Sequence, residues 1–126
     1  MKLLLDTHIW VWLVTGSARL KVRDTLRDSS NELWVSPLST WEVLTLEKKK
    51  RLALDRAPQD WVANAISGTH EAPLTHQIVV AARSLALRDD PADRLLAATA
   101  LVLNLTLVTA DQQLLGLPEI RTLANR

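Results

Sequence analysis

The chain of 126 residues contains no cysteine. This absence excludes a disulfide framework, thiolate ligation of zinc or of an iron–sulfur cluster, and a cysteine nucleophile. The three glycines, Gly16, Gly68 and Gly116, lie far apart, whereas the phosphate-binding P-loop and the dinucleotide-binding turn both need glycines close together. The G-x-S-x-G elbow of serine hydrolases is excluded for the same reason.

Long apolar runs are also missing. The stretch Leu95–Leu105 is interrupted by Asn104 and is too short to span a bilayer. The initial apolar run, Met1–Leu5, lacks the length of a signal peptide. The net charge of +1, from 15 basic and 14 acidic residues, is not that of a protein that holds nucleic acid by charge alone. We expect a cytoplasmic protein with no membrane segment, folded as a single domain over residues 1–126.

Short apolar runs alternate with helical segments along the chain. Strands are expected at Lys2–Asp6, Glu32–Ser36, Glu71–Thr75, Thr106–Thr109 and Ile120–Leu123. Helices are expected at Thr7–Thr15, Ser17–Ser29, from Ser39 onward, Pro58–Ile66, His76–Leu87, Pro91–Leu103 and Gln112–Leu115. This alternation predicts an α/β fold whose parallel sheet is covered by helices on both faces.

Four carboxylates lie where the expected strands end or the expected helices begin. Asp6 closes the first strand, and Glu42 lies in the first turn of the helix after the second strand. Asp93 lies in the first turn of the helix 91–103, and Asp111 follows the strand 106–109. Because the carboxyl ends of parallel strands share one edge of a sheet, we expect the four side chains to gather there.

Each acid also has a purely structural interpretation. The segment Ser39–Glu42 has the sequence of a capping box, which would explain its glutamate. Asp90 at the N-cap and Asp93 three residues later suit a helix start, and Asp111 could cap the turn that follows it. Asp6 has no such role beyond capping the next two residues.

Gathering the four acids would be costly, and that cost points to a ligand. Two carboxylates about 5 Å apart repel each other by roughly 3 kcal/mol at an effective dielectric constant near 20. A cation or a proton must therefore neutralise the group. An all-oxygen site without cysteine or paired histidines suits Mg²⁺ or Mn²⁺. Such an ion can activate water and stabilise charge on a phosphoryl group, so a phosphate ester is the expected substrate class.

Four segments of the sequence are similar to a known family. They are LLLDTHIWVW at 3–12, SPLSTWEV at 36–43, DPADRLLAATA at 90–100 and LVTAD at 107–111, in this order. Together they resemble the PIN domain and, within it, the VapC-type toxins of bacterial and archaeal toxin–antitoxin pairs. The resemblance covers essentially the whole chain. It implies a three-layer α/β/α sandwich with a central parallel sheet of four to five short strands. It also implies a metal-dependent endoribonuclease that forms a homodimer and is inhibited by a cognate antitoxin.

The resemblance also implies roles for individual residues. The acids of the family's quartet, which hold Mg²⁺ or Mn²⁺ and act in catalysis, match Asp6, Glu42, Asp93 and Asp111. The small hydroxyl residues beside that quartet match Thr7 and Thr109. We expect Asp6 and Asp93 to be the main ligands, with Glu42 and Asp111 completing the site directly or through water. A bound water would be the nucleophile.

Two further residues flank the expected site. Asp90 suits the N-cap of its helix better than a ligand position. For Arg94, pairing with Asp90 or a neighbouring acid is preferred to contact with an RNA phosphate.

Basic and aromatic residues suggest surfaces for partners. The block Lys48, Lys49, Lys50 and Arg51 suits the C-terminal end of a helix, and contact with RNA phosphates is the alternative. Trp10 and Trp12 lie two positions apart on one helix, about 200° round, so they cannot both face the core. The exposed one would either pack against a neighbouring helix or anchor the antitoxin or second subunit. We expect Trp34, Trp41 and Trp61 in the core rather than as base-stacking platforms.

Two other functions remain open from the sequence. One is a catalytically silent PIN-like module that binds RNA or protein, and the other is a housekeeping RNA-processing nuclease. A receiver domain is disfavoured because no lysine follows Lys50, and a haloacid-dehalogenase-like phosphatase because Asp6-Thr7-His8 lacks the Asp-x-Asp pattern.

Overall fold

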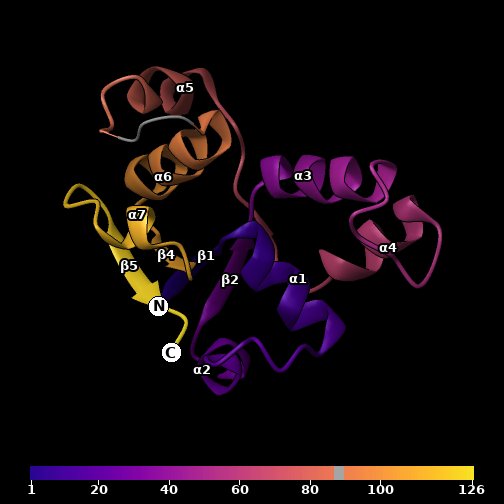
Figure 1. The fold of residues 1–126 in the computed structure, drawn as a ribbon. Coiled ribbons are helices and arrows are strands. Elements are labelled where there is room, and N and C mark those ends of the chain that lie inside the picture. The colour runs from indigo at the N-terminus through magenta and orange to yellow at the C-terminus, as the bar shows by residue number, and fades with distance from the viewer. Residues whose placement is uncertain (87–89) are drawn as a thin grey trace.

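In the computed structural model, which describes residues 1–86 and 90–126, five parallel strands form one sheet (Figure 1). The strands are β1 (Lys2–Leu5), β2 (Glu32–Val35), β3 (His70–Glu71), β4 (Thr106–Thr109) and β5 (Arg121–Ala124). Their order across the sheet is β3-β2-β1-β4-β5, and every neighbouring pair is parallel. The expected parallel sheet is confirmed.

Helices connect the strands. They are α1 (Thr7–Thr15), α2 (Arg23–Arg27), α3 (Pro37–Lys48), α4 (Pro58–Ala65), α5 (His76–Ala82), α6 (Pro91–Leu103) and α7 (Gln112–Leu115). The bounds of α1, α6 and α7 are those expected from the sequence. The expected end of the fifth helix at Leu87 lies outside the described residues.

Three elements differ from expectation for identifiable reasons. α2 does not begin at Ser17, because the Arg23 guanidinium donates to the carbonyls of Trp12, Leu13 and Ser17 and holds this segment around the end of α1. β3 ends before Pro73, which has no N–H to donate to the sheet. α3 begins at Pro37, because Ser36 rather than Ser39 is its N-cap.

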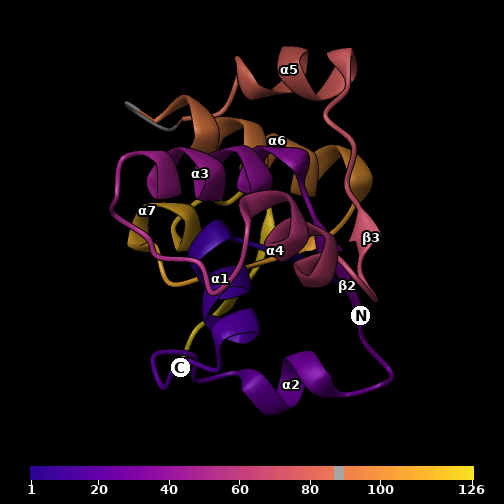
Figure 2. The same cartoon turned by 90° about the vertical axis from the view of Figure 1, so that its right-hand side faces the viewer.

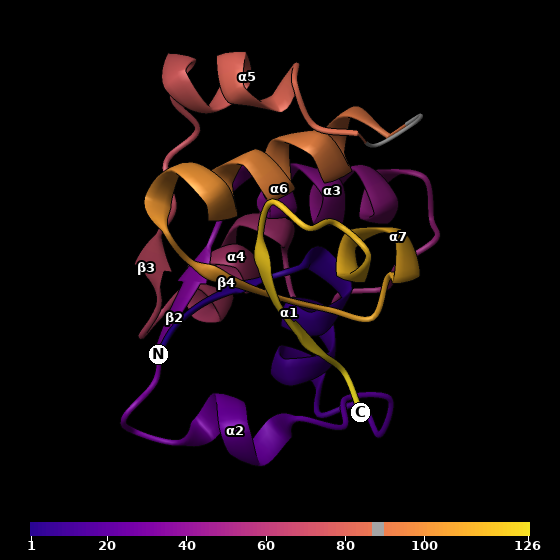
Figure 3. The same cartoon turned by 90° about the vertical axis from the view of Figure 1, so that its left-hand side faces the viewer.

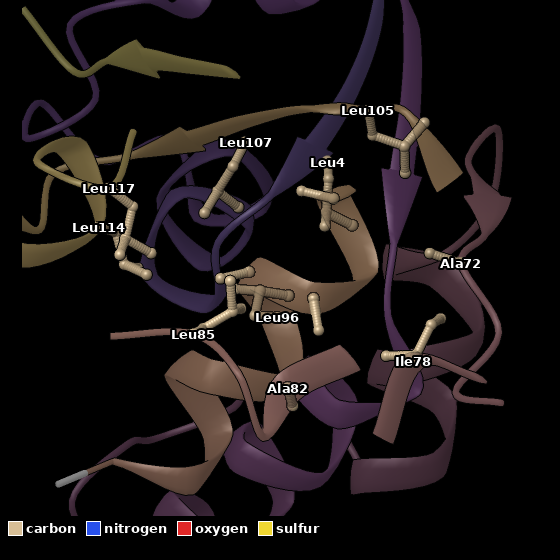
Figure 4. Packing of buried hydrophobic residues seen from close by; sticks show 13 residues of the cluster. Leu4, Ala72, Ile78, Ala82, Leu85, Leu96, Leu105, Leu107, Leu114 and Leu117 are labelled. Atoms are coloured by element: carbon tan, nitrogen blue, oxygen red, sulfur yellow. The ribbon is translucent and has the colours of Figure 1, made fainter. Parts of the chain in front are cut away.

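The sheet separates two layers of helices, as the alternation of side chains along β1 requires. Leu3 and Leu5 pack in one cluster with side chains of α1, α3 and α4. Leu4 and Leu107 pack in the other cluster with side chains of α5, α6 and α7. Figure 4 shows the second cluster, where Leu96 of α6 points toward the strands. Figure 2 shows α1, α3 and α4 nearest the viewer, and Figure 3 shows β5 and α7 from the opposite side. The fold is thus a three-layer α/β/α sandwich.

The tryptophans confirm one expectation and contradict another. As expected, Trp10 and Trp12 do not both face the core. Trp10, one of the two candidate partner anchors, is 0% exposed and so cannot be the exposed one: its indole N–H donates to the Ala65 carbonyl at 3.2 Å, and its ring packs edge-on against Trp61. Trp12 is the partly exposed member of the α1 pair. Trp41, expected in the core, is 68% exposed because it lies on the side of α3 opposite the buried Val43. Trp61 is buried as expected.

The order of the strands creates a natural place for a site. After β1 the chain builds β2 and β3 on one side, and it then returns to add β4 and β5 on the other. Ligands of open α/β sheets bind at such a reversal, beyond the carboxyl ends of the strands. α1 and α3 begin at these ends, and α6, which leads into the start of β4, brings its N-terminus to the same edge.

None of the helices found within residues 1–86 and 90–126 combines the length and the apolar character needed to cross a membrane.

Candidate active site at the carboxyl edge of the sheet

Asp6 is fixed by hydrogen bonds from two elements. It follows β1 and is the N-cap of α1, where its Oδ1 accepts from the Thr7 N–H at 2.8 Å. Its Oδ2 accepts from the Thr109 hydroxyl, at the end of β4, at 2.6 Å. The Asp6 N–H also donates to the Val108 carbonyl at 3.0 Å. The carboxylate is therefore held over the junction of the two central strands.

Glu42 reaches the same junction from α3. Thr7 Oγ1 donates to Glu42 Oε1 at 2.8 Å, and a second hydrogen bond of 2.9 Å joins the hydroxyls of Thr7 and Ser39. Thr7 and Ser39 are both buried. The expected capping box is wrong, since the helix begins at Pro37 and Glu42 lies in its second turn. Glu42 therefore does not cap its own helix. Its carboxylate accepts the hydrogen bond from Thr7, the first residue of α1.

Asp90 and Asp93 stand at the start of α6. Asp90 Oδ1 accepts from the N–H groups of Ala92 at 2.9 Å and Asp93 at 3.4 Å, so the N-cap predicted from the sequence is confirmed. Asp93, the third residue of α6, is partly buried. Arg94 follows it and is also partly buried.

Asp111 caps the short helix α7. Its Oδ1 accepts from the N–H groups of Gln113 at 2.7 Å and Leu114 at 3.2 Å. Its own N–H donates to the Thr109 hydroxyl at 3.0 Å, which links it to the residue that also holds Asp6. An open depression of about 560 Å³ lies here, lined by Asp90, Asp93, Asp111, Gln112 and Gln113.

The charges of the acids at this edge act on one another. Burial of the Asp93 carboxyl, together with the smaller effects of the negative charges of Asp90, Asp6, Asp111 and Glu42, raises its pKa to about 7. Burial also raises the pKa of Glu42, with smaller contributions from Asp6 and Asp90, against the opposing hydrogen bond from Thr7. The structure thus concentrates negative charge at this edge of the sheet.

The donors at this edge fit a hard divalent cation, since they are carboxylate and hydroxyl oxygens. Across residues 1–86 and 90–126, however, no three histidine, aspartate or glutamate side chains are arranged so that they could hold a metal ion as they stand. The acids are close enough to shift one another's pKa values, but their side chains do not have the geometry of metal coordination.

Sequence reasoning missed three residues of this region. Ser39 was interpreted as a cap, and Gln112 and Gln113 were assigned only to a helical turn. The position of Ser39 three residues before Glu42, on the same face of a helix, was the signal that could have linked the two.

The basic residues Lys48–Arg51 are exposed at the opposite end of α3, where the helix terminates.

The raised pKa of Asp93 has a consequence for stability. Because this pKa is about 7 in the folded chain against an ordinary value of 3.8, the folded state binds the proton more tightly. The resulting stabilisation is present below about pH 4 and is lost as the pH rises through about 7. With EDTA present, Asp93→Asn should therefore raise the melting temperature by a few degrees at pH 8 and much less at pH 4. An equal change at both pH values would contradict the charge cluster.

The sequence is similar to those of known proteins. Residues 3–119 match the PIN domain family. Ribonuclease VapC22 of Mycobacterium tuberculosis is 29% identical over an alignment of 114 residues, and the match covers 88% of this chain and 88% of that protein.

Solved structures share the fold. VapBC2 from Rickettsia felis, bound to a DNA fragment from its promoter, has a TM-score of 0.76 at 17% identity, with 98% of each chain covered. DNA-bound VapBC from Salmonella typhimurium has a TM-score of 0.72 at 20% identity, with 100% of this chain and 99% of that chain covered. Because the family match extends over nearly the whole sequence, the chain belongs to the PIN domain family.

Proposed function

We propose that this protein is a metal-dependent endoribonuclease and the toxin of a toxin–antitoxin pair. The convergence of Asp6, Glu42, Asp93 and Asp111 on one sheet edge, with the pKa of Asp93 raised to about 7, carries the proposal. Bringing carboxylates together lowers the stability of the folded chain because their charges repel each other. A divalent cation bound between them would offset this repulsion. The relative VapC22 is named a ribonuclease. Solved structures with a similar fold include a toxin–antitoxin complex from Klebsiella pneumoniae and VapBC-5 from Mycobacterium tuberculosis, a member of the VapBC family of toxin–antitoxin systems.

Asp6 and Asp93 would be the main ligands of Mg²⁺ or Mn²⁺, and Glu42 and Asp111 would complete the site directly or through water. A divalent ion bound there supplies a water of lowered pKa and charge stabilisation on the phosphoryl group. A carboxylate of the cluster orients the attacking water or accepts its proton.

The surrounding residues position these carboxylates. Thr109 and the Thr7 N–H each donate to one oxygen of Asp6, which fixes the plane of its carboxylate. The Thr7 hydroxyl orients Glu42 in the same way. Asp90 secures the start of α6, and Arg94, which is partly buried, would pair with a neighbouring acid. Such supporting groups are needed because a loosely held carboxylate binds metal weakly.

The remaining surfaces would serve the partners. Lys48, Lys49, Lys50 and Arg51 would contact the phosphates of the RNA substrate, since all four are exposed. Trp12, partly exposed on α1, would contact the cognate antitoxin. The buried Trp10 would contribute only by holding α1 in place through its packing in the core. We place the protein in the cytoplasm, where its RNA substrate is found, as a homodimer.

Removing one carboxylate tests the catalytic site. Asp6→Asn and Asp93→Asn should each lower Mn²⁺-dependent cleavage of total RNA by about a hundredfold or more, because loss of even an outer partner of a metal ligand costs about 10–100-fold. Cleavage is measured on gels, and Asp24→Asn on the exposed side of α2 serves as the matched control. Undiminished cleavage by either site variant would remove that residue from the mechanism.

Metal binding should be visible without any activity. Because an ion that binds only the native state stabilises it, Mn²⁺ should raise the melting temperature of the wild-type chain and of Asp24→Asn. At about 100 times the dissociation constant the gain is about 2.7 kcal/mol. Asp93→Asn should lose most of this rise. An equal rise in Asp93→Asn would place the ion elsewhere.

The toxin role is tested in cells. Expression of the wild-type chain should slow growth, expression of Asp93→Asn at the same soluble level should not, and the product of a small neighbouring gene should relieve the effect. Unimpaired growth at high soluble expression of the wild type would favour a silent binding module.

A further inference from the structure

We infer that the outer face of α3 holds an unpaired stretch of the RNA substrate, with one base stacked on Trp41 and the phosphates beside it on Lys48–Arg51. This inference rests on the proposed function and adds to it a residue that binds the substrate. Trp41 would be a binding residue of the enzyme, outside the metal site.

The exposure of Trp41 is the first observation. Its side chain is 68% exposed, whereas Trp10 and Trp61 are buried and Trp12 and Trp34 are partly buried. Trp41 therefore contributes little to the hydrophobic core. A large aromatic ring left in water is a costly surface unless a partner covers it.

The position of Trp41 relative to the site is the second observation. Trp41 immediately precedes Glu42, so their Cα atoms are about 3.8 Å apart. Glu42 is tied to Thr7 and, through it, to the end of β1. Successive side chains on a helix point about 100° apart, so a base stacked on Trp41 would lie on the face of α3 next to the one that carries Glu42, one residue from the proposed cleavage site.

The charge of the same helix face is the third observation. Lys48 lies seven residues after Trp41, which is about two turns and roughly 10 Å along one face. Lys48, Lys49, Lys50 and Arg51 are all exposed. Lys50 lines an open depression of about 310 Å³, but Glu47 also lines it and Arg56 on its rim is paired with Asp55 at 3.0 Å. The cations proposed to contact phosphates are therefore the exposed Lys48–Arg51 themselves.

This combination favours RNA over a second protein. The centres of protein interfaces are enriched in tryptophan but depleted of lysine. Surfaces that bind single strands combine an aromatic platform with a track of Lys and Arg along the backbone. Base stacking needs the face of a base, which a duplex keeps covered, so the aromatic platform selects unpaired RNA.

The test is the affinity for a labelled single-stranded RNA oligonucleotide, measured by fluorescence anisotropy in EDTA so that no cleavage occurs. Trp41→Ala should raise Kd about tenfold, and Trp41→Phe, which keeps an aromatic face, should stay within about threefold. Val80→Ala, a similarly exposed apolar position on α5, should bind like the wild type. Lys49→Ala should reduce the slope of log Kd against log salt by about 1, while Trp41→Ala leaves the slope unchanged.

Binding and cleavage separate the two proposals. Failure of the wild type to cleave any RNA with Mn²⁺ or Mg²⁺ would overturn the proposed nuclease, whatever the anisotropy shows. Unchanged affinity in Trp41→Ala, equal loss in Trp41→Phe, or no binding by the wild type would overturn the stacking site. A change of oligomeric state in Trp41→Ala, measured by light scattering, would overturn it as well and assign this face to a second copy of the chain.

Discussion

The hydrogen bond from the Thr109 hydroxyl to Asp6 is the constraint on which the site depends. It joins the ends of β1 and β4, the two strands between which the order of the sheet reverses, at 2.6 Å. The same carboxylate caps α1 through the Thr7 N–H, so one side chain ties together three elements. Because Thr109 is fully buried, the position of Asp6 is set by the packing of the sheet itself.

The other acids approach this fixed point from separate elements, and the fold tolerates their repulsion. Asp93 and Asp111 stand at helix N-termini, where the helix dipole favours negative charge. Glu42 has no such support and relies on the Thr7 hydroxyl. The raised pKa values of Asp93 and Glu42 show that this compensation is incomplete. A site that is electrostatically unfavourable when empty is well suited to attract a cation.

Much of the fold follows from local sequence signals. The bounds of α1 and α6 could be predicted because each helix has a strong stop, Gly16 or Asn104, and a capping acid at its start. The gathering of the acids followed from parallel topology. The direction of Glu42 did not, because a capping-box sequence also occurs inside a helix that begins earlier. The burial of Trp10 and the exposure of Trp41 depend on which side of each helix meets the sheet, and apolar periodicity alone does not identify that side.

The shortness of β3 affects how copies of this chain can associate. It is an edge strand of two residues, both exposed, and Pro73 lies just beyond it. It therefore offers few unpaired backbone groups on which a foreign strand could pair, and such pairing is the usual route to fibrous aggregates. When this protein accumulates to high concentration, this edge of the sheet therefore gives copies of the chain little opportunity to pair strand to strand.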